Sequence, residues 1–220
     1  MQTIVDSNPA ARIAQDLVAA LALCDAPHLA VSGGSTPKVL FQLLANEYRD
    51  QVRWDALTIW QVDERSVPPD DPQSNWRMLN ETLLSKVTGV RAHRMEAERA
   101  SGAEDYERLL RAHVHNVVRG IPQLDVVLLG MGGDGHTASL FPGTAALEEA
   151  SRLVVRNEVP QLATSRVTMT YPLINAARNR WFLAAGADKA DAFNRVRAGE
   201  LPSSRIVDPR WYIDSAAAGV

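Results

Sequence analysis

A glycine-rich loop carries an aspartate and a histidine directly after an apolar run, in the segment Gly130–His136. Neutral imidazole beside a carboxylate is a common general base, because the ring accepts a proton near pH 7 and the carboxylate stabilises the cation that results. We therefore predict that His136 is a catalytic base and that Asp134 orients it. The alternative is a histidine that only satisfies backbone groups in a tight loop. The residues whose backbone N–H groups are candidates for binding an oxyanion are Gly132, Gly133 and Gly135.

The same segment matches the spacing G-x-G-x-x-G, which also occurs in dinucleotide-binding proteins. In those proteins the motif opens a long helix. Here Pro142-Gly143 interrupts the chain within seven residues of Gly135. We therefore reject a dinucleotide site and predict that the protein uses no cofactor.

A second glycine-containing segment, Ser32–Pro37, joins a predicted strand to a predicted helix. Two glycines allow a sharp turn, and the free N–H groups of a helix start attract anions. We predict that Thr36 is the N-cap, that Pro37 is the first helical residue and that the turn binds phosphate. A plain strand-to-helix turn is the alternative, since the lysine of the Walker A pattern is absent. The residues assigned to this phosphate site are Gly33, Gly34, Ser35 and Thr36.

Three charged residues, Asp63, Glu64 and Arg65, follow the apolar end of another predicted strand. We predict that they point into the same cleft, with a solvated ion-pair cluster as the alternative. No pair of histidines has the spacing of metal ligands: His113 and His115 are two residues apart on a predicted helix, so they face different directions. No metal site is predicted.

The elements that must position these loops alternate between helix and strand. Apolar residues recur every three to four positions after capping residues, and short apolar runs lie between these segments. Such alternation is typical of a parallel α/β sheet with helices on both faces, where ligands bind beyond the carboxyl ends of the strands. A capping box is predicted at Ser101–Glu104. We expect strands at His28–Val31, Leu57–Val62, Asp125–Gly130, Leu153–Arg156, Val167–Thr170, Trp181–Ala185 and Arg210–Asp214, and helices that begin near Pro9, Pro37, Ser74, Ser101 and Asp188.

Composition limits the classes of protein that need to be considered. The chain has 220 residues and a mass of 24.1 kDa, which suits one domain over residues 1–220. A net charge of -3 argues against a nucleic-acid binder, and no apolar run approaches the roughly 20 residues of a membrane span. A single cysteine, Cys24, excludes an internal disulfide and a thiolate zinc cluster. We expect a cytoplasmic protein.

Taken together, these loops resemble the 6-phosphogluconolactonase family. The resemblance covers nearly the whole chain with its motifs in the same order, which makes it far more specific than any single motif. It implies a Rossmann-like fold similar to that of glucosamine-6-phosphate deaminases and ribose-5-phosphate isomerases. The stretches that carry it are Val31–Pro37, Val62–Pro68, Gly130–Pro142, Arg166–Thr170 and Gly186–Ala190.

The resemblance implies an enzyme of the oxidative pentose phosphate pathway that hydrolyses 6-phospho-D-glucono-1,5-lactone to 6-phospho-D-gluconate. It assigns the phosphate to the cations Arg65, Arg166 and Lys189, and it requires no metal. The expected partner is a small sugar phosphate lactone, with no nucleic acid and no membrane, and the expected state is a monomer or weak homodimer. The alternatives are a sugar-phosphate isomerase or deaminase of the same fold, a non-catalytic sugar-phosphate sensor, or a scaffold protein.

Two positions separate this sequence from the deaminases of the same fold. In those enzymes an Asn-Glu-Pro segment follows the Asp-Gly-His triplet, and its glutamate assists the histidine in opening the sugar ring. Here Leu140 and Phe141 precede Pro142. The deaminases also carry an acidic pair in the second loop, usually followed by an aromatic residue, whereas Arg65 follows it here. A cation at that position lowers the basicity of the neighbouring carboxylates, so we expect lactone hydrolysis rather than deamination.

Overall fold

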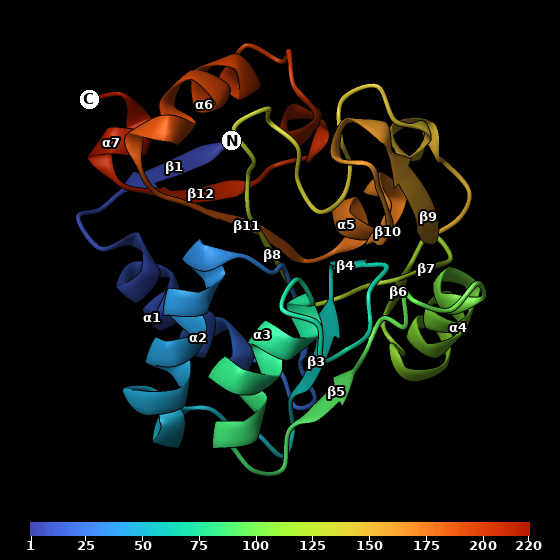
Figure 1. The fold of residues 1–220 in the computed structure, drawn as a ribbon. Helices are drawn as coiled ribbons and strands as arrows, with labels where there is room; N and C mark the ends of the chain where they lie inside the picture. The colour runs from blue at the N-terminus through green and yellow to red at the C-terminus, as the bar shows by residue number, and fades with distance from the viewer.

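A seven-stranded sheet forms the centre of the computed structural model, which describes residues 1–220 (Figure 1). Its strand order is β1-β12-β11-β8-β2-β3-β5, and every neighbouring pair is parallel. The predicted parallel α/β sheet is therefore confirmed. The strands are β1 (Gln2–Val5), β2 (His28–Val31), β3 (Thr58–Gln61), β5 (Arg91–His93), β8 (Val126–Leu129), β11 (Asn179–Ala184) and β12 (Arg210–Ile213).

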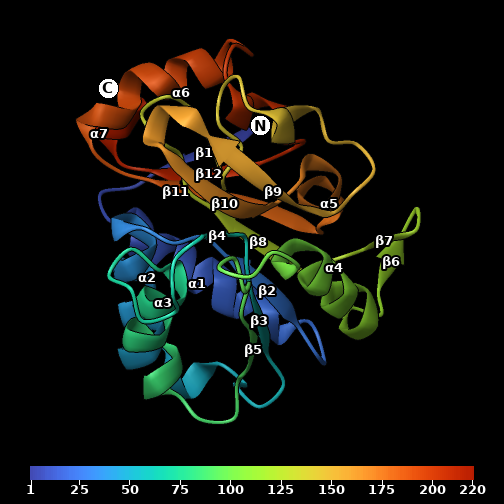
Figure 2. The same cartoon turned by 45° about the vertical axis from the view of Figure 1, so that its right-hand side comes forward.

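Helices cover both faces of this sheet, as Figures 1 and 2 show. Along β2 the side chains alternate between two cores: Leu29 and Val31 pack with α1, α2 and α3, whereas Ala30 packs with α4, α5 and α6. Burial on both faces explains why these strands read as continuous apolar runs. No helix is long and apolar enough to cross a membrane. The helices are α1 (Pro9–Ala22), α2 (Ser35–Asn46), α3 (Asn75–Thr82), α4 (Gly102–His113), α5 (Tyr171–Ala176), α6 (Ala190–Arg197) and α7 (Ser215–Ala218).

A second, antiparallel sheet of three strands lies above the carboxyl edge of the first (Figure 2). Its order is β4-β10-β9, with β4 at Asp63–Arg65, β10 at Thr164–Met169 and β9 at Val154–Val159. The chain therefore steps from β3 in the large sheet to β4 in the small one within two residues. Sequence periodicity predicted strands near both β9 and β10, but it gave no sign that they form a separate sheet. A short hairpin joins β6 (Val117–Val118) to β7 (Ile121–Pro122).

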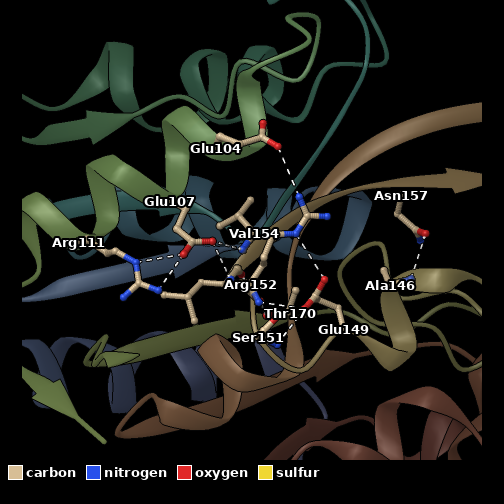
Figure 3. A network of polar contacts seen from close by, with 11 residues as sticks. Glu104, Glu107, Arg111, Ala146, Glu149, Ser151, Arg152, Val154, Asn157 and Thr170 are labelled. Atoms are coloured by element: carbon tan, nitrogen blue, oxygen red, sulfur yellow. Dashed lines mark hydrogen bonds and ion pairs between the residues drawn. The ribbon is translucent and has the colours of Figure 1, made fainter. Parts of the chain in front are cut away.

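A network of polar contacts fixes β9 against α4 (Figure 3). The Glu107 carboxylate of α4 accepts hydrogen bonds from the backbone N–H groups of Leu153 at 2.8 Å and Val154 at 3.3 Å. Arg152 extends the contact to Glu104, at 3.5 Å. Because β9 pairs with β10 along its length, this network also supports the strand that brings Arg166 to the cleft.

Two predicted helix caps are wrong. The capping box at Ser101–Glu104 does not form, because the Ser101 hydroxyl donates to Asp105 at 2.8 Å and makes no capping bond to the backbone. Helix α2 begins two residues earlier than predicted, at Ser35 and not Pro37, with Gly34 and not Thr36 as its N-cap. Gly34 has a φ of +118°, a conformation that glycine adopts without the strain that a side chain would add.

Histidines gather at the amino edge of the large sheet, opposite the predicted site. The buried His28 accepts a hydrogen bond at Nδ1 from Trp60 Nε1 at 3.0 Å, and His93 stacks on the same indole with 4.2 Å between ring centroids. Burial lowers the pKa of both imidazoles. For His28 the charge of Asp125 opposes this effect, and for His93 the charges of His113 and Arg91 add to it.

Acid should therefore destabilise this edge of the protein. A histidine whose pKa is lower in the folded than in the unfolded chain contributes its full stability above the unfolded value near 6.5, and loses it as the pH falls toward the folded value. We expect the free energy of unfolding to fall less between pH 7.5 and 5.5 in His93→Phe, which keeps the stack on Trp60, than in the wild type. Urea unfolding at the two pH values tests this, and equal losses in both proteins would contradict it.

Candidate active site

A cleft of about 220 Å³ lies at the carboxyl ends of the parallel strands, between the two sheets. Parallel α/β proteins bind ligands at this edge, because the loops that follow the strands converge there. The cleft is lined by the turn after β2, by β4, by the loop after β8 and by residues of β10 and of the turn after β11. The predicted site residues that line it are Gly33, Gly34, Ser35, Thr36, Asp63, Arg65, Gly132, His136, Arg166 and Lys189, whereas Gly133, Asp134 and Gly135 do not line it.

The His136 imidazole is bound to the Asp134 carboxylate, with 2.5 Å between Nδ1 and Oδ1. The same carboxylate oxygen accepts the backbone N–H of His136 at 3.1 Å. Partial burial opposes ionisation of Asp134, but the hydrogen bonds from His136 outweigh it and lower the pKa of that carboxyl below its usual value. An ionised carboxylate only accepts hydrogen bonds, so the proton lies on Nδ1 and the lone pair of Nε2 is free to accept another.

The backbone of the glycine loop is largely satisfied within the loop. Gly132 donates its N–H to the carbonyl of His136 at 2.9 Å, and Gly135 donates to the carbonyl of Gly132 at 3.0 Å. These two groups are therefore not free to bind an oxyanion, which corrects the sequence-based assignment. Gly132 has a different role: a Cβ there would lie 2.2 Å from the Nδ1 and Cε1 atoms of His136, so only glycine lets the ring lie against this backbone.

Phe141 lies beside the imidazole in the place where the deaminase resemblance calls for a glutamate. Its ring stacks on His136 with 3.9 Å between centroids and an interplanar angle of 25°. The guanidinium carbon of Arg166 lies 5.1 Å from the centroid of the same ring. Phe141 is almost completely buried. An apolar ring therefore contacts both the base and the cation, and no carboxylate other than Asp134 is paired with His136.

Arg65 and Arg166 face each other across the antiparallel pair β4 and β10, directly opposite in register. Like charges directly opposite each other destabilise a sheet, so an anion bound between the two guanidinium groups would offset their repulsion. The Nε–H groups of both side chains are buried and have no acceptor in the protein. Burial lowers the pKa of Arg166, the charge of Asp63 opposes this and the charge of Arg65 adds to it, although a guanidinium stays protonated at any physiological pH.

Asp63 lies at the base of the cleft and is nearly buried. Its Oδ2 atom accepts a hydrogen bond from the Ser139 hydroxyl at 2.6 Å and lies 4.0 Å from Nη1 of Arg166. The arrangement links the loop that carries His136 to the strand that carries Arg166. Asp63 therefore orients a cation of the cleft as well as lining it.

Glu64 does not point into the cleft, contrary to the sequence-based prediction. Alternation along β4 sends it to the other face, where it is 2% exposed. Its carboxylate binds the first N–H groups of α3 and thereby compensates for the amides that a helix start leaves without partners. The groups that donate to it are the backbone N–H of Arg65, Asn75 and Trp76, the Gln61 amide and the Ser74 hydroxyl.

Asn75 is a cleft residue that the sequence did not single out. It is held at the first position of α3, and its side-chain amide donates to the carbonyl of Asp63 at 3.0 Å. Its Oδ1 atom would lie 1.9 Å from a Cβ at Gly33, so this glycine is required by the close approach of α3. The sequence feature that could have indicated Asn75 is the pair Ser74-Asn75 at a helix start, considered together with the buried Glu64 that binds both residues.

Lys189 reaches the cleft from the turn that follows β11. Its Nζ atom lies 3.0 Å from the Asp188 carboxylate, which is largely exposed. The hydrogen bond from Lys189, supported by its charge, lowers the pKa of Asp188. No group of three or more histidine, cysteine, aspartate or glutamate side chains is arranged to hold a metal ion.

The fold and this cleft define a member of a known family. The family model for glucosamine-6-phosphate isomerases/6-phosphogluconolactonase matches residues 4–214, and the chain belongs to that family. It is 38% identical over 203 residues to a 6-phosphogluconolactonase of Nostoc sp., covering 86% of this chain and 82% of that protein. The solved structure of 6-phosphogluconolactonase from Trypanosoma brucei superposes with a TM-score of 0.87 at 27% identity, covering 99% of this chain and 97% of that one. A monomeric glucosamine-6-phosphate deaminase shares the fold, with a TM-score of 0.81 at 19% identity and coverage of 100% and 99%.

Proposed function

We propose that the protein is a 6-phosphogluconolactonase, an enzyme that hydrolyses 6-phospho-D-glucono-1,5-lactone to 6-phospho-D-gluconate in the oxidative pentose phosphate pathway. The observation that carries the proposal is a single cleft lined by His136, which is paired with Asp134, and by the opposed cations Arg65 and Arg166. This arrangement suits a substrate that has a hydrolysable bond at one end and a phosphate at the other. The names of the relatives supply the identity of that substrate.

His136 acts as the general base. Its Nε2 atom takes a proton from a water molecule as the water oxygen attacks the lactone carbonyl carbon, and a tetrahedral oxyanion forms. The bond between this carbon and the ring oxygen then breaks, and His136 returns the proton to that oxygen. The product is an open-chain acid, and the enzyme recovers its starting protonation state. Asp134 holds the ring in the tautomer that both transfers require and stabilises the imidazolium between them.

The phosphate is held by Arg65, Arg166 and Lys189, together with the amino end of α2. The first turn of a helix has N–H groups without intrahelical acceptors, and the helix dipole adds positive potential there. At α2 this turn begins directly after Gly34 and lines the cleft at Ser35 and Thr36. Because Gly132 and Gly135 donate within the loop, the Gly133 N–H is the remaining backbone candidate for binding the oxyanion.

A deaminase of the same fold is the strongest competing function, and Phe141 argues against it. An apolar ring stacked on His136 cannot relay a proton, whereas hydrolysis of a closed lactone needs no ring-opening step. We expect no ammonia release from glucosamine 6-phosphate, measured with a coupled glutamate dehydrogenase assay. Phe141→Glu alone should not create this activity, since Arg65 remains beside the acidic residues of β4. Deamination at a rate comparable to lactone hydrolysis would overturn the assignment.

A cytoplasmic location and a monomeric or weakly dimeric state stay predictions. Gel filtration with light scattering over a range of protein concentrations tests the second of them.

A further inference from the structure

A turn near the carboxyl end of the chain contacts the glycine loop that carries His136. It runs from Pro202 to Arg205 and contains Ser203, which is completely buried. Both the backbone N–H and the hydroxyl of Ser203 donate to the carbonyl oxygen of Gly135, at 3.0 Å and 2.8 Å. The two residues are 68 positions apart in the sequence, so this contact exists only in the folded protein.

The Gly135 carbonyl belongs to the peptide group that leads into His136. A peptide group is planar, so a hold on its carbonyl also fixes the direction of the N–H at its other end. That N–H is the His136 group that donates to Asp134 Oδ1, the atom that also binds the imidazole Nδ1. Ser203 and Asp134 therefore hold the same peptide from opposite ends, and the imidazole is attached to it.

The backbone at Gly135 is intrinsically flexible, so a contact from outside the loop is required to restrain it. Its φ is +75°, and glycine moves between backbone conformations more easily than any other residue. A Cβ at Gly135 would lie 2.6 Å from Leu201, so no side chain can fill the space and stiffen the loop. The supporting turn is itself anchored, because the Tyr171 hydroxyl donates to the Pro202 carbonyl at 2.8 Å.

We propose that Ser203 is a positioning residue for the general base: through the Gly135 carbonyl it fixes the orientation of the Gly135–His136 peptide and thereby of the imidazole. The expected effect on catalysis rests on the proposed function, whereas the contact between Ser203 and the Gly135–His136 peptide does not depend on it. Ser203 does not line the cleft, so its loss should impair the chemical step and leave substrate binding nearly unchanged.

Ser203→Ala and Ser204→Ala form a matched pair. Both remove a serine hydroxyl that bonds a carbonyl from the same turn, but the Ser204 hydroxyl bonds Leu201 at 2.7 Å within the turn and does not reach the glycine loop. We expect Ser203→Ala to lower kcat roughly 5- to 50-fold, through one lost hydrogen bond and a misplaced base, with KM within about twofold of the wild type. Ser204→Ala should keep kcat within about twofold, at a comparable melting temperature.

The backbone amide of His136 gives a readout that does not require activity. In ¹H–¹⁵N spectra this resonance should shift or broaden in Ser203→Ala and stay in place in Ser204→Ala. If Ser203→Ala does not fold, Ser203→Cys keeps the volume with a weaker donor and should show the same changes at smaller size. An unchanged kcat with an unmoved His136 amide would overturn the proposal, as would an equal loss of kcat in Ser204→Ala. A wild type without lactonase activity would refute the proposed function, while the amide comparison would still decide the role of Ser203.

Discussion

Replacement of His136 by alanine is expected to lower kcat roughly 10²- to 10⁴-fold, the usual cost of removing a general base. KM should change little, because the groups assigned to the phosphate lie on β4, β10 and the turn after β11. The effect should be large because the side chain supplies both proton transfers of the proposed mechanism. Steady-state kinetics on the phosphorylated lactone, corrected for spontaneous hydrolysis, measure both constants.

His115→Ala is the matched control for this variant. It also removes a histidine, but an exposed one in the hollow at the opposite edge of the sheet. We expect its kcat to equal that of the wild type. Free imidazole added to His136→Ala should restore part of the rate, because the lost ring leaves space against Gly132 and Phe141. A His136→Ala protein with more than about half of the native kcat would exclude His136 as the base.

Arg166→Ala or Lys189→Ala is expected to raise KM about 10- to 150-fold, the equivalent of a lost charge-assisted hydrogen bond of ~1.5–3 kcal/mol. A phosphate contact that changes little between ground state and transition state appears in KM and not in kcat. The variants should also lose much of their preference for the phosphorylated lactone over unphosphorylated gluconolactone. Lys189 gives the simpler variant, since Arg166 also contacts Phe141 and lies near Asp63.

Lys86→Ala serves as the control for the lysine variant. Lys86 is exposed and lies outside the cleft, so its removal changes the net charge by the same amount and should leave KM unchanged. If both cleft variants kept the native preference for the phosphorylated lactone, Arg166 and Lys189 would not belong to the phosphate site.

Local patterns in the sequence predicted most of the parallel sheet and most of the cleft. The apolar runs of β2 and β8 are buried on both faces, so their composition alone identifies them as inner strands. The loops that follow them line the cleft, because the topology of a parallel sheet brings such loops together at the carboxyl edge. The helices predicted near Pro9 and Ser74 form, with Asn8 and Ser74 as their N-caps, because an N-cap acts on residues two or three positions away and its signal is local.

Contacts between distant segments could not be predicted in this way. Nothing in the sequence near Arg65 indicates that Arg166 lies opposite it in the small sheet, because strand register depends on both strands together. Glu64 is buried because of its position on β4. The sequence showed three adjacent charged residues, and this pattern does not indicate which of the three is buried. Ser101 fails as a cap although its spacing to Glu104 is right, since its hydroxyl has a closer partner in Asp105.

The most direct test of the proposed function is an assay of the purified wild-type protein with freshly generated 6-phosphoglucono-1,5-lactone. Proton release is followed with and without the protein, so that spontaneous hydrolysis of the lactone is subtracted. The Asp134–His136 pair and the opposed arginines of the cleft predict saturable hydrolysis, with a kcat on the order of 1–10³ per second. Hydrolysis no faster than the spontaneous reaction would contradict the account, and tight binding of the product without turnover would identify the protein as a sensor.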